Sequence, residues 1–363
     1  MTDSNADELG SVHIIGTGLI GTSVGLALRR VGFDVTISDR EPATQAEAEA
    51  VGAGRGRLPD DPAPSIVIVA TPPASVGQVL ARAAVQWPAA TLTDVSSVKS
   101  STLADALSRG VPAERLIGGH PMAGREVSGP GGGRSDLFDD RVWVVCPTQA
   151  SEPARIAEID LLARSCGAVT VTMSPESHDT AVAVTSHAPQ VLASVLAARL
   201  MSEDEQVIAL AGQGLRDMTR IADSDPVLWE GILTWNGDRV HQVLVDVIAE
   251  LQSLSQELSE GNGAESAAVV DVLKRGVEGR SRIPGKHGGS GRDFEIVSVM
   301  VKDEPGELAS LFVAAGDLGV NLEDVRIEHV LGRPSGLIDL SVRPQVAQAL
   351  RDGLTEGGFD VRA

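Results

Sequence analysis

The chain has 363 residues, of which 30 are basic and 50 acidic, so its formal net charge at pH 7 is −20. This length exceeds that of a usual single domain and indicates about two or three domains. The negative charge repels phosphate backbones and excludes general nucleic-acid binding, so a small-molecule substrate is expected.

The sequence also predicts the compartment. No apolar run approaches the length needed to span a bilayer, and the first ten residues are acidic, so neither a membrane anchor nor a signal peptide is expected. Cys146 and Cys166 lie in no CxxC or metal-ligand spacing. We therefore expect a cytoplasmic protein with no metal site and no membrane contact.

Residues 10–174 alternate short β-rich runs with alanine-rich helical stretches, which is typical of a parallel, doubly wound α/β sheet. The predicted strands are residues 12–15, 34–38, 65–70, 90–94, 115–119, 141–146 and 169–173.

Residues 175–260 are expected to form an all-helical domain. Asp225 and Pro226 have the character of an N-cap and a first-turn proline that open one long helix. Within that helix, apolar residues recur at steps of three and four, at Val240, Leu244, Val247, Leu251, Leu254 and Leu258. This seam needs a partner helix, and we expect a homodimer, although a partner within the same subunit would also satisfy it.

The remaining chain is expected to form a linker and a third domain. Residues 261–292 are glycine-rich and basic, which is typical of a linker. Residues 293–363 predict a small α+β domain with the order βαββαβ, in which 295–301 and 336–342 are strands and 307–319 and 345–358 are helices.

A glycine motif follows the first predicted strand and opens a helix. Gly16 permits a tight turn, Gly18 lets backbone amides approach a pyrophosphate, and Gly21 allows close packing of helix on strand, with Leu19 and Ile20 between them. This setting predicts a Rossmann dinucleotide-binding domain.

The choice of dinucleotide depends on the end of the second strand. Asp39 follows Gly18 by about 20 residues, where a carboxylate accepts both ribose hydroxyls and repels a 2′-phosphate. NAD is therefore expected rather than NADP, although Arg40 beside it keeps NADP open. Thr71 and Pro72 follow the next strand on the same sheet edge and are expected to contact the cofactor.

Two further loops leave strand ends on the cofactor side. One contains Ser97 and Lys99, and the other presents His120 between a glycine pair and a proline. Oxidation of an alcohol by NAD requires removal of the hydroxyl proton as the hydride departs, and a neutral imidazole does this near pH 7. We therefore expect His120 to be the catalytic base and Ser97 to hold the hydroxyl.

The helical region supplies candidates for substrate binding. Arg220 is placed to receive a carboxylate in a bidentate pair, or else forms a surface salt bridge. The segment SPESHDTAVAVTSHAPQ carries His178, Asp179, His187 and Gln190.

These motifs together resemble the prephenate and arogenate dehydrogenases of tyrosine biosynthesis. The matching stretches are IIGTGLIGTSVGLAL, DVSSVK, GGHPMAG, SPESHD, VTSHAP and DMTRIADSDPVLW, in the family's order over most of residues 11–260. The resemblance implies NAD-dependent oxidation of the hydroxyl-bearing ring carbon of prephenate or arogenate, with loss of the ring carboxylate as CO₂.

The resemblance also implies residue roles. His120 polarises the hydroxyl, Ser97 bonds to it and Arg220 binds a carboxylate, while Lys99 and His187 are further substrate-binding candidates. Gln190, also assigned to substrate binding, stands where many prephenate-selective members carry a histidine, so the choice between prephenate and arogenate stays open.

The last domain resembles an ACT domain, a regulatory module that often binds amino acids. The resemblance rests on Asp303, Pro305 and Gly306 between the first strand and helix, and on Asn321 before the second strand. It implies feedback control by tyrosine or another aromatic amino acid, although plain dimerisation is the alternative.

Two other functions fit parts of the pattern. A 3-hydroxyacid dehydrogenase shares a Rossmann domain followed by helices, but would use Lys99 where our interpretation uses His120. A non-catalytic, NAD-responsive regulator with an ACT sensor would bind the dinucleotide without turnover.

Overall fold

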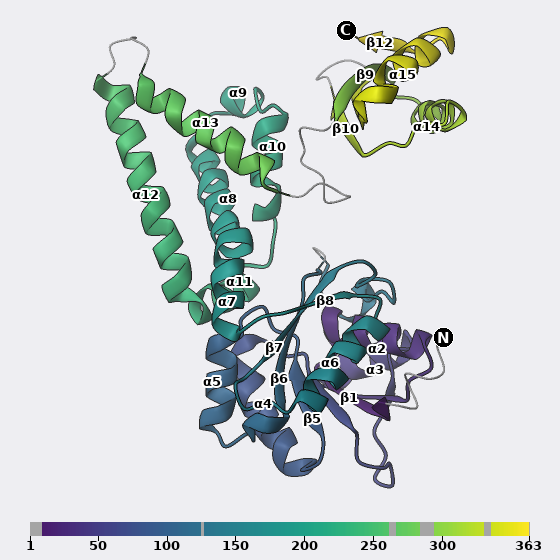
Figure 1. Ribbon diagram of the computed structural model, residues 1–363, viewed down its shortest axis with the longest axis vertical. Coiled ribbons are helices and arrows are strands. Elements are labelled where there is room, and N and C mark those ends of the chain that lie inside the picture. Colours follow the sequence, from purple (N-terminus) through teal and green to yellow (C-terminus); the bar gives the residue numbers. More distant parts are fainter. Residues whose placement is uncertain (1–8, 125–126, 261–265, 284–293, 330–334, 363) are drawn as a thin grey trace. The chain divides into compact units, whose positions relative to one another are not determined.

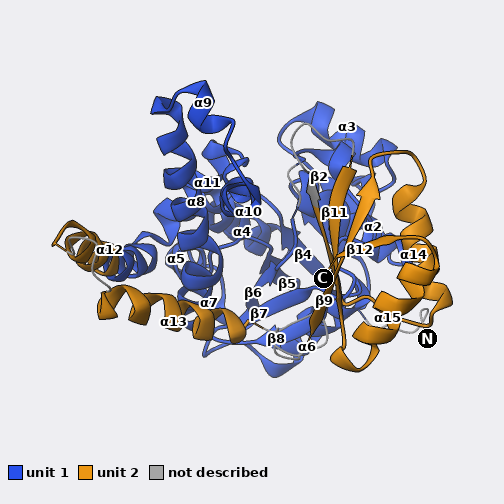
Figure 2. Cartoon of the chain, turned by 90° about the horizontal axis from the view of Figure 1, so that it is seen from above, with its two compact units in different colours: residues 1–248 blue, residues 249–363 orange. Residues whose placement is uncertain are grey.

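The computed structural model describes residues 9–124, 127–260, 266–283, 294–329 and 335–362 (Figure 1). The chain divides into two compact units, residues 1–248 and 249–363, each described here by itself (Figure 2).

The first unit begins with an eight-stranded sheet in the order β3-β2-β1-β4-β5-β6-β7-β8. All seven predicted strands are present, and the very short β3 was not predicted. The strands are β1 (Val12–Ile15), β2 (Val35–Ser38), β3 (Arg55–Gly56), β4 (Ile66–Val69), β5 (Thr91–Asp94), β6 (Leu116–Pro121), β7 (Val142–Pro147) and β8 (Val169–Thr172).

The sheet is parallel apart from one junction. Strand β7 runs antiparallel to β6, and β8 then pairs parallel with β7. The predicted parallel sheet therefore has one antiparallel junction, β6–β7, where the described residues between the two strands form no crossover α-helix and the chain returns beside β6 after the short turn η2 (Pro130–Gly132). Strands β1, β4, β5 and β6 remain parallel, so their carboxyl ends share one edge.

Helices cover both faces of this sheet (Figure 1). In β4, Ile66 and Ile68 pack with α2 and α6, whereas Val67 and Val69 pack with α4 and α5, as the two-residue period of a strand requires. The helices of this domain are α2 (Leu19–Arg30), α3 (Pro42–Ala50), α4 (Pro73–Gln86), α5 (Ser100–Ser108) and α6 (Pro153–Ser165), with the single turn η1 (Ala113–Arg115).

The helical region follows from Pro175. Its elements are α7 (Pro175–Val182), η3 (Ala183–His187), α8 (Ala188–Arg199), η4 (Leu200–Ser202), α9 (Glu205–Ile208), α10 (Gln213–Thr219), η5 (Arg220–Ala222), α11 (Pro226–Trp235) and α12 (Gly237–Glu260). The segment η3 is a π-helical turn that joins α7 to α8, a feature that often occurs at functional sites.

The helix predicted to open at Asp225 is interrupted. Asp225 caps α11 as expected, accepting hydrogen bonds from the amides of Val227 and Leu228. The expectation of one continuous helix is wrong, because the backbone of Asn236 leaves the helical conformation (φ −114°, ψ 23°) and its side chain turns into the interior, so α12 starts anew at Gly237.

One stretch, Pro175–Ser202, is long and apolar enough to cross a membrane, which contradicts the expectation that no such run exists. It carries His178, Asp179 and His187, all buried, and Asp179 accepts hydrogen bonds from the sheet domain at the backbone amide of Lys99. These three polar side chains are thus paired inside the folded unit.

The second unit contains a helix inside the predicted linker. Helix α13 (Ala267–Ser281) begins at Ser266, whose hydroxyl accepts the amide of Val269. Arg275 of α13 pairs with Glu250 of α12 at 2.9 Å. Residues 261–292 are therefore not a plain linker; the basic stretch 284–292 lies outside the described residues.

The C-terminal domain has the predicted βαββαβ order, with β9 (Glu295–Lys302), α14 (Glu307–Asp317), β10 (Asp324–His329), β11 (Ser335–Val342), α15 (Pro344–Glu356) and β12 (Asp360–Arg362). Its antiparallel sheet has the order β10-β11-β9-β12, and alternate residues of β9 and β11 pack against α14 and α15.

Candidate active site

The glycine loop between β1 and α2 has the geometry that its motif predicts. Gly16 adopts φ +100°, and a Cβ there would lie 2.4 Å from the carbonyl oxygen of Ala70. A Cβ at Gly21 would lie 2.0 Å from the carbonyl oxygen of Gly16, whereas one at Gly18 would meet nothing within 4 Å. Gly16 and Gly21 thus allow close packing, whereas Gly18 leaves open space before the amino end of α2. This helix begins at Leu19, and Ile20 follows.

Asp39 faces this loop from the end of β2. Its Oδ2 accepts the backbone amide of Thr17 at 2.7 Å and the Thr17 hydroxyl at 3.0 Å, while Oδ1 accepts the amide of Glu41. Arg40 is exposed and pairs with Glu41 at 3.2 Å. The carboxylate beside the glycine loop suits ribose hydroxyls, and the adjacent Arg40 is already paired with an acid.

Thr71 lies beside the glycine loop, and no described residue pairs with its hydroxyl. Its side chain lies against Gly16, and its buried hydroxyl has no hydrogen-bond partner among the described residues. Pro72 next to it is exposed and precedes α4. A buried hydroxyl without a partner costs free energy, so this orphaned group beside an open glycine loop fits a polar ligand such as a dinucleotide.

Lys99 was expected to bind substrate, but its side chain is buried among other groups of the chain. Its ammonium is fully buried, pairs with the carboxylate of Asp94 and donates to the carbonyl oxygen of Gly119 at 2.7 Å. An ammonium enclosed by these partners does not face a substrate, so the substrate-binding role predicted for Lys99 is not supported. The same burial removes the base required by a 3-hydroxyacid dehydrogenase. Lys99 instead joins the end of β5 to the backbone just before His120.

His120 lies at the end of β6 and begins a chain of hydrogen bonds. Its Nδ1 is 2.7 Å from Nε2 of His178, whose Nδ1 is 2.8 Å from Oδ1 of Asp179. Asp179 also accepts the backbone amides of Lys99 at 2.8 Å and Ser100 at 2.7 Å, so it caps the amino end of α5. The side chains of His120, His178 and Asp179 are all buried.

The charges of this chain follow from its contacts. Burial raises the pKa of the Asp179 carboxyl, but hydrogen bonds from His178 and the amides of Lys99 and Ser100 outweigh it and hold that pKa below its usual value. The ionised carboxylate only accepts, so a His178 ring with one proton carries it on Nδ1, and its Nε2 then accepts from Nδ1–H of His120. The Nε2 of His120 is then a lone pair, bonded to no described residue.

Burial is also the main reason why the pKa of His120 lies well below 6.5, followed by the repulsion that His178, Lys99 and His187 exert on a second proton. His120 is therefore neutral near pH 7. Neutral imidazole with a lone pair at Nε2 is the form that accepts a proton.

The remaining predicted residues lie around this cluster. Ser97 follows β5, is half-buried and makes no side-chain hydrogen bond to a described residue. His187, at the end of η3, is buried with its Nδ1 3.1 Å from the amide nitrogen of Asn236. Gln190 is bonded to Ser224 at 2.7 Å, which ties α8 to the segment that follows the exposed Arg220.

Three functional candidates were not assigned a site role from the sequence. His178 and Asp179 were noted in their motif, and Asn236 was not noted at all. The adjacency of His178 and Asp179 before a helix was the available signal, but their partners are 58 and 80 residues away in the chain. Nothing local distinguishes Asn236 from an ordinary helix residue.

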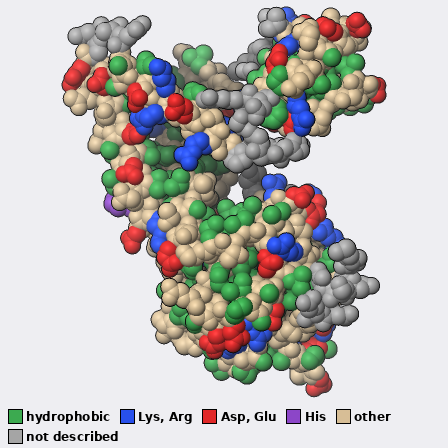
Figure 3. All heavy atoms as spheres, in the orientation of Figure 1, with side chains coloured by type: hydrophobic (Ala, Val, Ile, Leu, Met, Phe, Trp, Pro, Cys, Tyr) green, Lys and Arg blue, Asp and Glu red, His purple; other side chains and the backbone are tan. Residues whose placement is uncertain are grey.

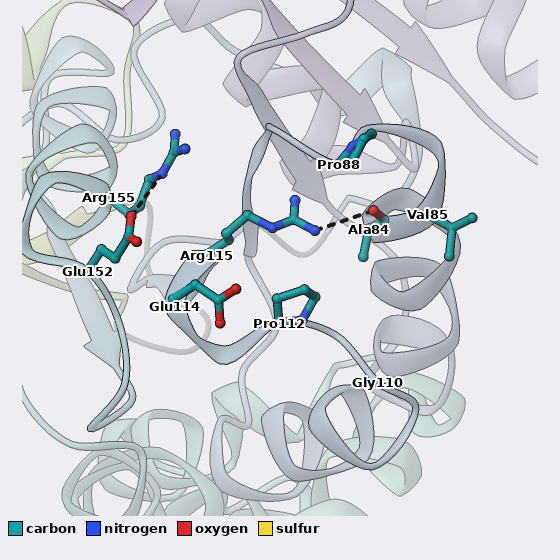
Figure 4. A pocket seen from close by; sticks show the side chains of 9 residues that line it. All are labelled: Ala84, Val85, Pro88, Gly110, Pro112, Glu114, Arg115, Glu152 and Arg155. Carbon is teal, nitrogen blue, oxygen red and sulfur yellow. Dashed lines mark hydrogen bonds and ion pairs between the residues drawn. The ribbon is translucent and has the colours of Figure 1, made fainter.

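One cavity of the first unit lies away from this cluster. About 530 Å³ opens near the starts of β5 and β6, at the sheet edge opposite the glycine loop (Figure 4). Arg115 in its wall donates to the carbonyl oxygens of Ala84, Trp87 and Ala90, and Arg155 pairs with Glu152. Since these cations already have partners, the cavity has the character of a structural groove.

Family comparisons agree with this geometry. The model described as "Prephenate dehydrogenase, nucleotide-binding domain" matches residues 24–172, and "Prephenate dehydrogenase, dimerization domain" matches residues 174–274. The chain belongs to the prephenate dehydrogenase family. The predicted family and fold class are therefore confirmed for the sheet domain and the helical domain, whereas neither model extends into the C-terminal domain.

Individual members of the family are similar over long stretches. "Probable prephenate dehydrogenase NovF" of Streptomyces niveus is 34% identical over 93% of this chain and 95% of its own length. The structure of prephenate dehydrogenase from A. aeolicus, in complex with hydroxyphenyl propionate and NAD⁺, is 28% identical with a TM-score of 0.67 and covers 75% of this chain and 98% of that one.

Synechocystis arogenate dehydrogenase is also similar, with 26% identity, a TM-score of 0.62 and coverage of 74% of this chain and 99% of that one. Family members named for either substrate thus share this fold at comparable identity, and similarity alone does not choose between prephenate and arogenate.

Proposed function

We propose that His120 is the base with which this member of the prephenate dehydrogenase family oxidises prephenate or arogenate. The chain is an NAD-dependent dehydrogenase of this type, acting in tyrosine biosynthesis. The observation that carries the proposal is the buried chain His120–His178–Asp179, which leaves one imidazole lone pair, Nε2 of His120, without a partner among the described residues.

During the reaction, the hydroxyl proton of the substrate moves to the lone pair on Nε2 of His120. As the hydroxyl proton of the substrate reaches Nε2, His120 becomes an imidazolium, and its Nδ1–H bond to His178 strengthens because His178 is in turn bonded to the Asp179 carboxylate. When bound, NAD⁺ accepts the hydride from the substrate ring carbon that bears this hydroxyl. The oxidised ring is a vinylogous β-keto acid, so the bond to CO₂ breaks and its electron pair moves through the ring to the carbonyl oxygen. The ring becomes aromatic, and the phenolate oxygen takes back the proton held by His120.

Other residues hold the substrate. Ser97 bonds to the ring hydroxyl, and the exposed guanidinium of Arg220 receives a carboxylate in a bidentate pair. The ring of His187 donates a hydrogen bond to the substrate. Lys99 has no contact with substrate in this proposal and positions Gly119, the residue before His120.

Gln190 leaves the substrate choice open for a physical reason. Its amide nitrogen contacts the hydroxyls of Ser224 and Ser194. Hydroxyls both donate and accept, so either orientation of the amide is satisfied. Gln190 can therefore present an acceptor to the ammonium of arogenate or a donor to the ketone of prephenate.

Steady-state assays with both substrates and both cofactors test the proposal. We expect NAD-dependent turnover with at least one substrate, and a higher kcat/KM with NAD than with NADP because Asp39 disfavours a 2′-phosphate. Absence of turnover with both substrates, together with retained NAD binding, would favour the NAD-responsive regulator.

The surface of the helical region supports a homodimer. Val240 of the predicted seam is buried, but Leu251 and Leu258 are exposed, and so are Val245 and Ile248 on the same helix. Hydrophobic side chains reach the visible surface of these helices (Figure 3). A second copy of the dimerisation domain would cover them, and light scattering of the purified chain should give twice the monomer mass.

The ACT-like domain is proposed to bind an aromatic amino acid. Gly306, at φ +97°, leaves open space at the amino end of α14, next to the exposed Asp303 and Pro305. Asn321 is exposed and donates to Glu323 at 3.3 Å. Titration of the full-length chain with tyrosine, phenylalanine and tryptophan should give binding heat and inhibition with at least one of them.

A cytoplasmic location is proposed from cysteine chemistry. Cys146 and Cys166 are free and buried, and burial raises the pKa of the Cys146 thiol to about 12. Such thiols are unreactive and serve packing, which suits a reducing compartment. Fractionation of cells that express the chain should recover the activity in the soluble fraction.

A further inference from the structure

Asn236 stands where the helix predicted from Asp225 onward is broken. It is only 2% exposed, and its side chain enters the interior between α7 and η3. A helix break that buries a polar amide costs stability, because buried polar groups must be paired. Its contacts therefore need an explanation.

The contacts fix the orientation of the amide. Nδ2 lies 2.9 Å from the backbone carbonyl oxygen of Asp179, which can only accept, so the atom facing it must be the nitrogen. The second hydrogen of Nδ2 points to Nδ1 of His187 at 3.1 Å. A flipped amide would place Oδ1 against the carbonyl oxygen, leaving that acceptor without a donor.

A donor at Nδ1 determines the tautomer of His187. Nδ1 must carry a lone pair to accept from Asn236, so the single proton of the neutral ring resides on Nε2. We propose that Asn236 is a positioning residue that holds His187 in the Nε2–H tautomer, so that His187 offers the substrate a neutral hydrogen-bond donor. The proposal rests on the proposed function in one respect, the contact between His187 and substrate.

The charged and titratable neighbours of His187 agree with a neutral ring. Asp179 and His178 lie on α7, His120 lies on β6, and Trp229 of α11 contacts the ring edge-on at 6.0 Å between centroids. Burial lowers the pKa of His187 to about 4, against the attraction of Asp179 and together with the repulsion of His178. At pH 7 the ring therefore has one proton, and its position is the variable that Asn236 controls.

Nitrogen NMR of the resting enzyme tests the tautomer without substrate. The chain has seven histidines, so selective ¹⁵N-histidine labelling gives few signals, and His187→Gln assigns the one of interest. The proposal requires that His187 shows the Nε2–H pattern in the wild type and loses it in Asn236→Asp, whose carboxylate favours a proton on Nδ1. A wild-type ring protonated on Nδ1, or an Nε2–H pattern unchanged in the variant, overturns the proposal.

Kinetics provide a second readout that a merely structural role would not give. In Asn236→Asp at pH 8, KM for the substrate should rise about tenfold or more, the loss expected for one hydrogen bond to a charged group, with a smaller change in kcat. Acid should then rescue the variant, because the carboxylate raises the pKa of His187 and a doubly protonated ring regains Nε2–H. The ratio of variant to wild-type KM should therefore fall between pH 8 and pH 6.

Ser101→Ala is the matched control. The Ser101 hydroxyl donates to the carbonyl oxygen of Trp235 at 2.8 Å, so this variant loosens the same helix break without touching His187. It should leave both the tautomer and KM unchanged, and a ratio that is flat with pH in Asn236→Asp contradicts the proposal. Absence of wild-type turnover would instead refute the proposed function, while the NMR result would still stand.

Discussion

The glycine loop after β1 leaves backbone and one threonine hydroxyl open to a ligand, whereas the cluster around His120 pairs its charged side chains, Lys99 and Asp179, with other groups of the chain. Gly18 has empty space around it and the Thr71 hydroxyl has no partner among the described residues. In the cluster, Lys99 and Asp179 each bond to several groups from other segments. The first region depends on its ligand to pair these groups, whereas the charged side chains of the second are already paired within the chain.

This difference shows how the two regions should respond to change. A substitution in the loop acts through the space that it fills, and its effect should appear in cofactor binding. A substitution in the cluster removes one partner of a buried pair, which leaves the other without compensation and should affect folding as well as rate. His120 is the exception within the cluster, because one of its two ring nitrogens has no bond to a described residue.

His120→Asn should produce the largest change. Removal of a general base typically lowers rate by 10²–10⁴-fold, so we expect kcat to fall by about that factor while the KM for NAD changes little. His241→Asn, an exposed histidine of α12, is the matched control and should retain wild-type kcat. A His120→Asn enzyme with near wild-type kcat would show that another group accepts the proton.

Lys99→Met should mainly reduce stability. The ammonium pairs with Asp94 and both side chains are fully buried, and removal of one partner of a buried ion pair costs about 3–5 kcal/mol. Urea denaturation measures this loss. Arg109→Met breaks a solvent-exposed pair with Asp105 and should leave stability nearly unchanged.

If Lys99 instead met the substrate directly, Lys99→Met would fold with wild-type stability and lose activity. The double variant Asp94→Asn with Lys99→Met separates the cases further, since removal of both charges should recover part of the lost stability.

The two regions also differed in how far the sequence predicted them. The loop depends on local spacing, and Gly16, Gly18, Gly21 and Asp39 lie where the motif places them. The pairing of Lys99 with Asp94 was not predicted, because lysine in a loop beside a strand end looks alike whether it faces a ligand or a buried carboxylate. Only the tertiary pairing with Asp94 distinguishes these cases.

The helical region shows the same difference between local signals and tertiary contacts. The N-cap at Asp225 is a local signal and was predicted, whereas the break at Asn236 was not. Apolar periodicity continues across the break, so the pattern indicates one helix. The break is stabilised by bonds to Asp179 and His187, which are 57 and 49 residues away. Local helix propensity contains no information about contacts with residues so far away in the chain.

Gly18→Ala and Gly21→Ala form a matched pair in the loop. A methyl group at Gly21 would lie 2.0 Å from the carbonyl oxygen of Gly16, so this variant should lose about 1–3 kcal/mol of stability as overpacked cores do. At Gly18 the methyl group meets open space and the backbone has φ −67°, so the fold should be unaffected. Its cost should be a KM for NAD raised about tenfold, equivalent to one or two lost hydrogen bonds.

A similar rise in the KM for NAD for both variants, without loss of stability in either, would contradict the distinction drawn between packing and ligand-facing glycines. Thermal unfolding without cofactor, followed by NAD titration, separates the two effects.

The smallest expected effect concerns pH. Because burial holds the pKa of His120 well below 6.5, the neutral form that accepts the proton persists as the pH falls, and kcat/KM for the substrate should change less than about twofold from pH 8 to pH 5.5. A histidine with the ordinary pKa of about 6.5 would be about 90% protonated at pH 5.5, and the rate would fall about tenfold. Gly18→Ala, whose methyl group lies in the cofactor loop, should keep the wild-type profile at saturating NAD. A decline in kcat/KM centred near pH 6.5 would mean that His120 is solvated in the working enzyme, so that its lone pair faces water as openly as the glycine loop does.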